Sequence, residues 1–203
     1  TMEQQFVDRR ASLLANKIAR TNLFMQRQNI QKVPVTFAGE QLDFIRLAMV
    51  DGINEDALRT IDFHQRCIGA DIDNGRQYWC MKKDDEIIGL SGFHYRLWDP
   101  KSIVWGGWFV AQPNASAMTK IAMLLDTLKV LLEETDYKQL YIEVFADTTQ
   151  SNILGIYQSL LFTELSRFEN FYGPQQDMVV MKLELDELRQ HWLSLTSAQL
   201  QVQ

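Results

Sequence analysis

Several features that often reveal a function directly are scarce in this chain. It has two cysteines and three histidines among 203 residues, and neither set has the spacing of a metal site or a disulfide framework. No apolar run is long enough to cross a bilayer, and there is no Gly-x-Ser-x-Gly elbow, Walker-type lysine loop or His-Glu-x-x-His motif. We therefore expect a protein of the reducing cytoplasm that holds no metal and spans no membrane.

An excess of positive charge is missing as well. Twenty Lys and Arg residues are outnumbered by 26 Asp and Glu, which gives a net charge of −6 and argues against general binding to nucleic acid or acidic membranes. Only residues 3–32 are locally basic, and a solvated helix face explains this more simply than a binding arm. The 46% of hydrophobic residues is typical of a soluble globular protein with a large core.

Apolar spacing predicts helices at both ends of the chain and a strand-rich middle. The stripe that begins at Val7 and the one that begins at Leu185 predict terminal helices that either pack on each other or form a dimer contact. The predicted helices are 3–31, 40–50, 54–68, 117–132, 150–162 and 185–199, and the predicted strands are 33–37, 77–82, 86–96, 103–110, 139–146, 165–172 and 178–185.

The stretch from Ile103 to Leu125 is the most informative. A short β-branched and aromatic run to Val110 predicts a buried strand, Pro113 ends it, and Asn114 or Ser116 is a candidate N-cap for the helix that follows. A strand, a tight loop and a helix N-terminus together direct unsatisfied N–H groups and the positive end of the helix dipole to one point. This arrangement suits a phosphate.

This order resembles the pyrophosphate-binding motif of the GNAT acetyltransferase superfamily. In that motif a strand ending in Val is followed by Pro and then by Arg/Gln-x-x-Gly-x-Gly/Ala at the start of a long helix. The Arg/Gln position falls here on Ser116, and the glycine-rich positions fall on Ala117, Thr119 and Ile121, none of which is glycine. Side chains there should crowd a pyrophosphate, and Lys120 should offset part of that cost as a point charge.

A second stretch carries the same resemblance. Strand 139–146 precedes a helical run that is similar to the family's Asn-x-x-Ala-x-x-Leu-Tyr-x-x-x-Gly-Phe, with Tyr157 and Phe162 matching in type and spacing. Gln150 falls on the Asn position, with Asn152 as the alternative in a shifted register, and Leu161 falls on the Gly position. The resemblance covers residues 77–185.

The resemblance implies an α+β (α/β) fold with a mixed, mostly antiparallel central sheet flanked by helices. The predicted organisation is an N-terminal helical extension (1–32), a GNAT-like domain (33–185) and a C-terminal helix (186–203). The implied co-substrate is acetyl-CoA or another acyl-CoA, and the implied acceptor is a small amine or a protein amine. No nucleic acid, membrane or metal is expected, and a homodimer is possible.

The resemblance also implies roles for individual residues. Tyr157 would protonate the departing thiolate, since an ordinary phenol has a pKa near ~10 and is neutral at pH 7. Glu143 is a candidate general base, although a structural strand residue or a base acting through water remains open, and His94 is a further candidate. The expected acceptor-site residues are His94, Trp98 and Trp105, with core packing as the alternative for the tryptophans. The expected CoA-binding residues are Phe109, Val110, Ser116, Ala117, Met118, Thr119, Lys120, Ile121, Gln150 and Asn152.

Two functions follow from these expectations. The first is N-acyl transfer by direct attack of the amine on the thioester, with a tyrosine as general acid. The alternative, suggested by the missing glycines and the added terminal helices, is a protein of the same fold that has lost catalysis and acts by binding a ligand or associating with a partner.

Overall fold

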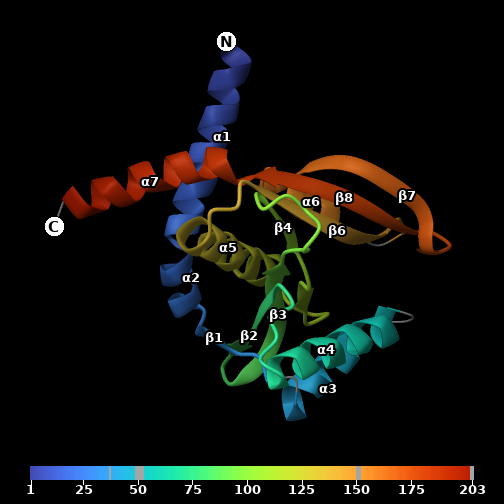
Figure 1. Ribbon diagram of the computed structural model, residues 1–203. Coiled ribbons are helices and arrows are strands. Elements are labelled where there is room, and N and C mark those ends of the chain that lie inside the picture. Colours follow the sequence, from blue (N-terminus) through green and yellow to red (C-terminus); the bar gives the residue numbers. More distant parts are fainter. Residues whose placement is uncertain (37, 49–52, 150–151, 202–203) are drawn as a thin grey trace.

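The computed structural model describes residues 1–36, 38–48, 53–149 and 152–201, and it is organised around one eight-stranded sheet (Figure 1). The strand order is β1-β2-β3-β4-β6-β8-β7, with β5 pairing β3 beyond the end of β4. Neighbouring strands are antiparallel except β4 and β6, which are parallel. The strands are β1 (Ile30–Pro34), β2 (Arg76–Lys83), β3 (Glu86–His94), β4 (Ile103–Gly106), β5 (Val110–Ala111), β6 (Gln139–Asp147), β7 (Thr163–Gly173) and β8 (Gln176–Glu184). The expected mixed, mostly antiparallel sheet is confirmed.

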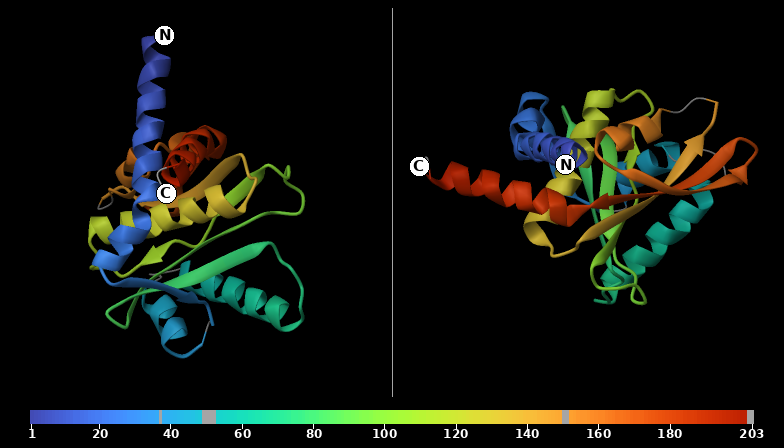
Figure 2. Two further views of the ribbon diagram at one scale, coloured as in Figure 1. Left: turned by 90° about the vertical axis from the view of Figure 1, so that its left-hand side faces the viewer. Right: turned by 90° about the horizontal axis from the view of Figure 1, so that it is seen from above.

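Helices cover both faces of this sheet (Figure 2). One face carries α5, and α1, α2 and α7 pack around it; the main hydrophobic core lies there. A smaller core on the other face joins α3 and α4 to the sheet through Ile45, Ile61, Cys80 and Leu90. The helices are α1 (Met2–Ala19), α2 (Thr21–Arg27), α3 (Gly39–Ala48), α4 (Ile53–Gly69), α5 (Ala117–Glu134), α6 (Ile153–Ser159) and α7 (Leu185–Gln201).

The N-terminal segment differs from the predicted single helix 3–31 and strand 33–37. Arg20 leaves helical geometry between α1 and α2, and Asn29, with a φ of 52°, ends the helical region in the left-handed conformation that Asn tolerates. The strand therefore starts earlier, at Ile30. It lies at the sheet edge, where Pro34, which has no N–H to donate, is tolerated at its end.

The prediction of one continuous strand over residues 103–110 is also wrong. The chain leaves the sheet after Gly106 and rejoins it at Val110. β4 pairs β3 only at its last residues, and Gly107 N–H then donates to the Gly92 carbonyl at 3.2 Å. The chain rejoins β3 further along as β5, where Gln112 N–H donates to the Ile88 carbonyl at 2.9 Å. The apolar run in the sequence is continuous and does not reveal this interruption. The interruption arises from the way β4 and β5 pair with β3.

The terminal helices pack against each other, which was one of the two expected arrangements, and both contribute to the main core. Leu14 and Ile18 of α1 are buried there together with Leu185, Leu188 and Trp192 of α7. The first turns of α1 and the last turns of α7 extend beyond the rest of the protein (Figures 1 and 2). None of the helices in the described ranges is long and apolar enough to cross a membrane.

Arg189 attaches α7 to the end of α5. Its Nη2 donates to the carbonyl oxygens of Leu131, Thr135 and Tyr137 at 3.3, 3.2 and 2.9 Å, and its Nη1 pairs with Asp186 at 2.9 Å. The last carbonyls of a helix have no partner within the helix, so a cation there is favourable both as a donor and toward the helix dipole. The C-terminal helix thus caps the long helix of the main core.

Candidate active site

A cleft opens where β4 and β6 stop running side by side. Their parallel register extends from Ile103 opposite Gln139 to Gly106 opposite Ile142. Beyond this point β5 follows β3, while β6 continues along β8, so the two middle strands diverge. The cleft between them has a volume of about 820 Å³. Its walls include residues 106–111 and 142–145, three residues of α5, and Ile153, Tyr157 and Phe162.

Two backbone groups expected to contact an acyl-CoA, those of Phe109 and Val110, belong to residues that line the cleft. Because Gln112 N–H donates to Ile88, the alternation of an antiparallel ladder directs the N–H of Val110 at its partner Leu90 on β3. This alternation does not extend back through residues 107–109, which lie outside the strands and where Gly107 N–H also donates to β3.

Tyr157 is 6% exposed and lies in the wall of the cleft. Its ring packs edge-on against Phe162, with the ring centroids 5.3 Å apart. Its hydroxyl makes no hydrogen bond to any residue that the structure describes. Burial raises the pKa of Tyr157 well above that of an ordinary phenol, since the charged form would lose its hydration. The side chain is therefore neutral at physiological pH.

The N-terminus of α5 is arranged differently from the expectation of a crowded phosphate site. Ser116 is the N-cap, and its Oγ accepts from Thr119 N–H at 3.1 Å. The Thr119 side chain is buried and its Oγ1 lies 3.0 Å from Ser116 Oγ, so it does not project outward. The N–H groups of Ala117 and Met118 make no hydrogen bond within the described residues. None of residues 116–121 is among those lining the cleft.

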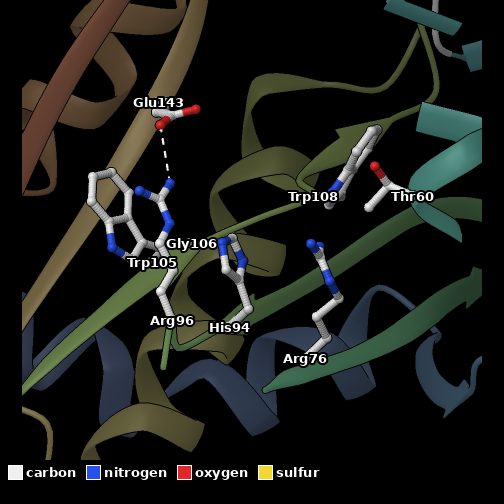
Figure 3. A pocket seen from close by; sticks show the side chains of 8 residues that line it. All are labelled: Thr60, Arg76, His94, Arg96, Trp105, Gly106, Trp108 and Glu143. Atoms are coloured by element: carbon white, nitrogen blue, oxygen red, sulfur yellow. Dashed lines mark hydrogen bonds and ion pairs between the residues drawn. The ribbon is translucent and has the colours of Figure 1, made fainter. Parts of the chain in front are cut away.

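A smaller pocket of about 210 Å³ adjoins the cleft on the α4 side of the sheet (Figure 3). The strand register explains its composition, because Arg76, His94 and Trp105 are direct cross-strand neighbours on β2, β3 and β4. The two cavities share His94, Gly106, Trp108 and Glu143, so a ligand in the pocket would meet one in the cleft at these residues. Of the expected acceptor-site residues, the structure places His94 and Trp105 in the pocket.

Glu143 lines both cavities and is held by Arg96. Its Oε1 lies 3.2 Å from Arg96 Nη2, and the Arg96 guanidinium in turn lies 3.9 Å above the centre of the Trp105 ring (Figure 3). The Glu143 side chain is 44% exposed, so this ion pair positions the carboxylate more than it stabilises the fold. Glu143 is therefore the carboxylate of β6 at the junction of the two cavities.

His94 is neutral at this junction. Burial lowers its pKa from 6.5 to about 4, and the nearby charges of Arg76 and Arg96 lower it further in the same direction. Its Nδ1 is buried without a hydrogen-bond partner in the described part of the chain. A Cβ on Gly107 would lie 2.9 Å from its Cε1, so the absence of a side chain at Gly107 leaves room for the imidazole. An unprotonated imidazole can accept a proton or a hydrogen bond from an amine.

Other sequence-predicted residues lie elsewhere. Trp98 is 81% exposed and lines neither cavity, because it belongs to the turn after β3 that faces solvent. Gln150 lies outside the described residues. Asn152 is exposed at the start of α6 and makes no capping hydrogen bond. Within the described ranges no group of three or more His, Cys, Asp or Glu side chains is arranged to hold a metal ion.

Neither Arg76 nor Arg96 stands out in the sequence as a site residue. Arginines at strand ends ordinarily face solvent, and only the cross-strand register brings Arg76 beside His94. The alternation of side chains along β6 is visible in the sequence, and it places Glu143 and Tyr141 on the same face of the sheet.

The sequence matches no protein-family model and no curated protein at a significant level. Solved structures resemble it in fold. A protein from Desulfovibrio desulfuricans assigned to the GNAT acetyltransferases has a TM-score of 0.60 at 15% identity, covering 77% of this chain and 99% of its own. A chimeric spermidine N-acetyltransferase from Vibrio cholerae gives 0.61 at 12% identity, covering 79% and 98%. The Campylobacter jejuni N-acetyltransferase PseH gives 0.52 at 19%, covering 77% and 98%.

Proposed function

We propose that this chain, which has the fold of the GNAT N-acetyltransferases, transfers an acyl group from acetyl-CoA or another acyl-CoA to an amine. The observation that carries the proposal is the cleft between the diverging strands, with the neutral, buried Tyr157 in its wall and a second pocket opening beside it. A thioester would enter from one side and an amine from the other. Their reacting atoms would meet near Gly106 and Glu143.

The residues at this junction fit direct attack by the amine. Glu143, directly or through water, would accept a proton from the ammonium so that the amine nitrogen can bond to the thioester carbon. Phe109 N–H would donate to the carbonyl oxygen as negative charge develops there. The carbon–sulfur bond then breaks, and Tyr157 would give its proton to the departing thiolate. The acylated nitrogen would lose its remaining extra proton to solvent, and solvent would return a proton to the phenolate and take up the one held by Glu143.

Binding of the cofactor's phosphates would depend on few groups. The N–H groups of Ala117 and Met118 and the side chain of Lys120 lie at the positive end of α5, where anions are favoured. Ser116 already satisfies the N–H of Thr119, which removes one donor that a glycine-rich loop would offer. We therefore expect CoA to bind more weakly here than at a site with all donors free.

Isothermal titration with CoA and a thiol-release assay with acetyl-CoA and a panel of amines test this function. We expect saturable CoA binding and amine-dependent release of free CoA. Absence of binding at millimolar CoA would exclude the acyltransferase. Binding without turnover on any amine would instead favour the alternative.

That alternative, a protein of this fold without catalysis, is supported by one specific observation: no residue from 116 to 121 lines the cleft. Under it, the cleft would hold a ligand, CoA or another, without acyl transfer. Turnover that Tyr157→Phe abolishes would exclude it.

Two further expectations remain proposals of the same kind. Cys67 and Cys80 are free and buried, in keeping with the reducing cytoplasm expected from the sequence. A homodimer also remains a proposal, which light scattering of the full chain would test.

A further inference from the structure

The acceptor pocket carries an excess of positive charge. Among the side chains that line it, Arg76 and Arg96 are cationic, Glu143 is anionic, and His94 is neutral at pH 7 for the reasons given above. The formal charge of the lining is therefore +1. A partly desolvated site strengthens such charge interactions compared with water. A ligand that brings a negative charge would be favoured and one that brings a second positive charge would be disfavoured.

Arg96 is already occupied, because it stacks on Trp105 and pairs with Glu143. Arg76 is not. Within the described residues, the one hydrogen bond of its side chain runs from Nη1 to the Tyr78 hydroxyl at 3.0 Å, and no carboxylate there pairs with the guanidinium. A guanidinium has five N–H donors, so most of those of Arg76 remain available. Figure 3 shows its guanidinium beside His94, directed into the pocket.

We infer that the acceptor is a small amine that also carries a carboxylate, and that Arg76 binds this carboxylate. The inference rests on the proposed acyl transfer and names its substrate class. The planar fork of a guanidinium matches the two oxygens of a carboxylate, which gives both affinity and orientation. A carboxylate on Arg76 would point the amine toward the junction of the two cavities, where Glu143 and Gly106 lie.

The same charges prepare the amine for attack. Like charges within a few ångströms disfavour a protonated group, so an ammonium near Arg76 and Arg96 would lose its proton more readily than in water. The same effect acts on His94: after burial, which is the main cause, the charges of Arg76 and Arg96 also lower the pKa of its imidazole. This effect lowers the demand on the general base, and it also disfavours polyamines, whose remaining ammonium groups would meet the arginines.

Equilibrium binding tests the inference without requiring turnover. The probes are matched pairs of N-acetyl amino acids and their amides, which differ only in the carboxylate, titrated calorimetrically into the protein with and without saturating CoA. We expect at least one acid to bind ten times more tightly than its amide, or better. Arg76→Gln should remove this difference and Arg76→Lys should retain part of it. Arg9→Gln, which removes an exposed arginine of α1, should leave it unchanged. Circular dichroism of each variant checks that it is folded.

The thiol-release assay then separates the two proposals. If the acids bind more tightly than their amides but no acyl transfer is detected, the anion site is supported and the proposed acyltransferase activity is contradicted. Transfer to amino acid amides with a free amine, or to putrescine and spermidine, as efficiently as to the free amino acids would support the enzyme and overturn the inference. Failure of every acid to bind more tightly than its amide would overturn it as well. A selective rise in KM for carboxylate acceptors in Arg76→Gln would confirm it.

Discussion

Replacing Tyr157 by Phe is the most direct probe of the proposed chemistry, because it deletes one hydroxyl and leaves the ring. The ring is what the fold uses: it is buried, and it packs on Phe162 with centroids 5.3 Å apart. The hydroxyl makes no hydrogen bond to a described residue, so its removal leaves no protein group unpaired. We therefore expect the free energy of unfolding to change by less than about 0.5 kcal/mol.

Turnover should change much more. A positioned general acid contributes roughly 10²- to 10⁴-fold to a rate, which corresponds to about 3–5 kcal/mol in the activation free energy. Since the hydroxyl would act on the departing thiolate and not on the bound ground state, kcat should fall by this factor while the dissociation constant of CoA stays nearly unchanged.

The assay is thiol release under saturating acetyl-CoA, combined with calorimetric titration of CoA. Tyr137→Phe, at a half-buried tyrosine outside both cavities, is the matched control and should behave like the parent protein. Because the pKa of Tyr157 is raised above its ordinary value of 10.0, the phenol should stay protonated, and activity should show no alkaline loss from this group below about pH 10. An unchanged kcat in Tyr157→Phe would refute the general-acid role.

Three other predictions concern stability. The pKa of His94 is lowered to about 4, so between pH 6.5 and 4 the unfolded chain binds a proton that the folded chain does not, and stability should fall as pH falls. Urea unfolding should show about 2 kcal/mol of this loss between pH 7 and pH 5, reduced in His94→Gln, and an unchanged pH dependence would contradict it. Ser116→Ala should cost about 1 kcal/mol of stability by removing the α5 N-cap, yet should not weaken CoA because it frees Thr119 N–H; weaker CoA binding would show that the Ser116 hydroxyl itself contacts the cofactor. Arg189→Gln should cost about 2–3 kcal/mol in thermal or urea unfolding, and a loss below about 0.5 kcal/mol would mean that water replaces its three carbonyl contacts.

Local patterns predicted the elements well because their causes are local. The Asp84-Asp85 turn between β2 and β3 has both residues at positive φ, as a two-residue hairpin turn requires, and Asp tolerates this conformation. Leu161, which stands where the family pattern has glycine, also has a positive φ of 71°. The family pattern therefore predicts a position with positive φ correctly, even though leucine stands there in place of glycine.

The site could be predicted only in part, since its composition depends on register between distant strands. Glu143 and Tyr157 were predicted from the family resemblance, and both lie in cavity walls. The cationic character of the smaller pocket was not predicted, because Arg76 lies in its wall only through pairing with His94, 18 positions further along the chain. The overall charge of −6 gave no indication of it. Net charge describes the whole surface, whereas a pocket is governed by the few charges in its wall.

The attachment of α7 to α5 through Arg189 has a mechanical consequence. Helix α5 lines the cleft with Leu124, Thr127 and Leu128, and its last turn is tied to a helix more than fifty positions later in the chain. Fraying of this end of α5 requires the hydrogen bonds from Arg189 to break. Amide hydrogen exchange in the last turn of α5 should therefore be slower in the full chain than after removal of α7, which makes the order of one wall of the cleft depend on the C-terminal helix.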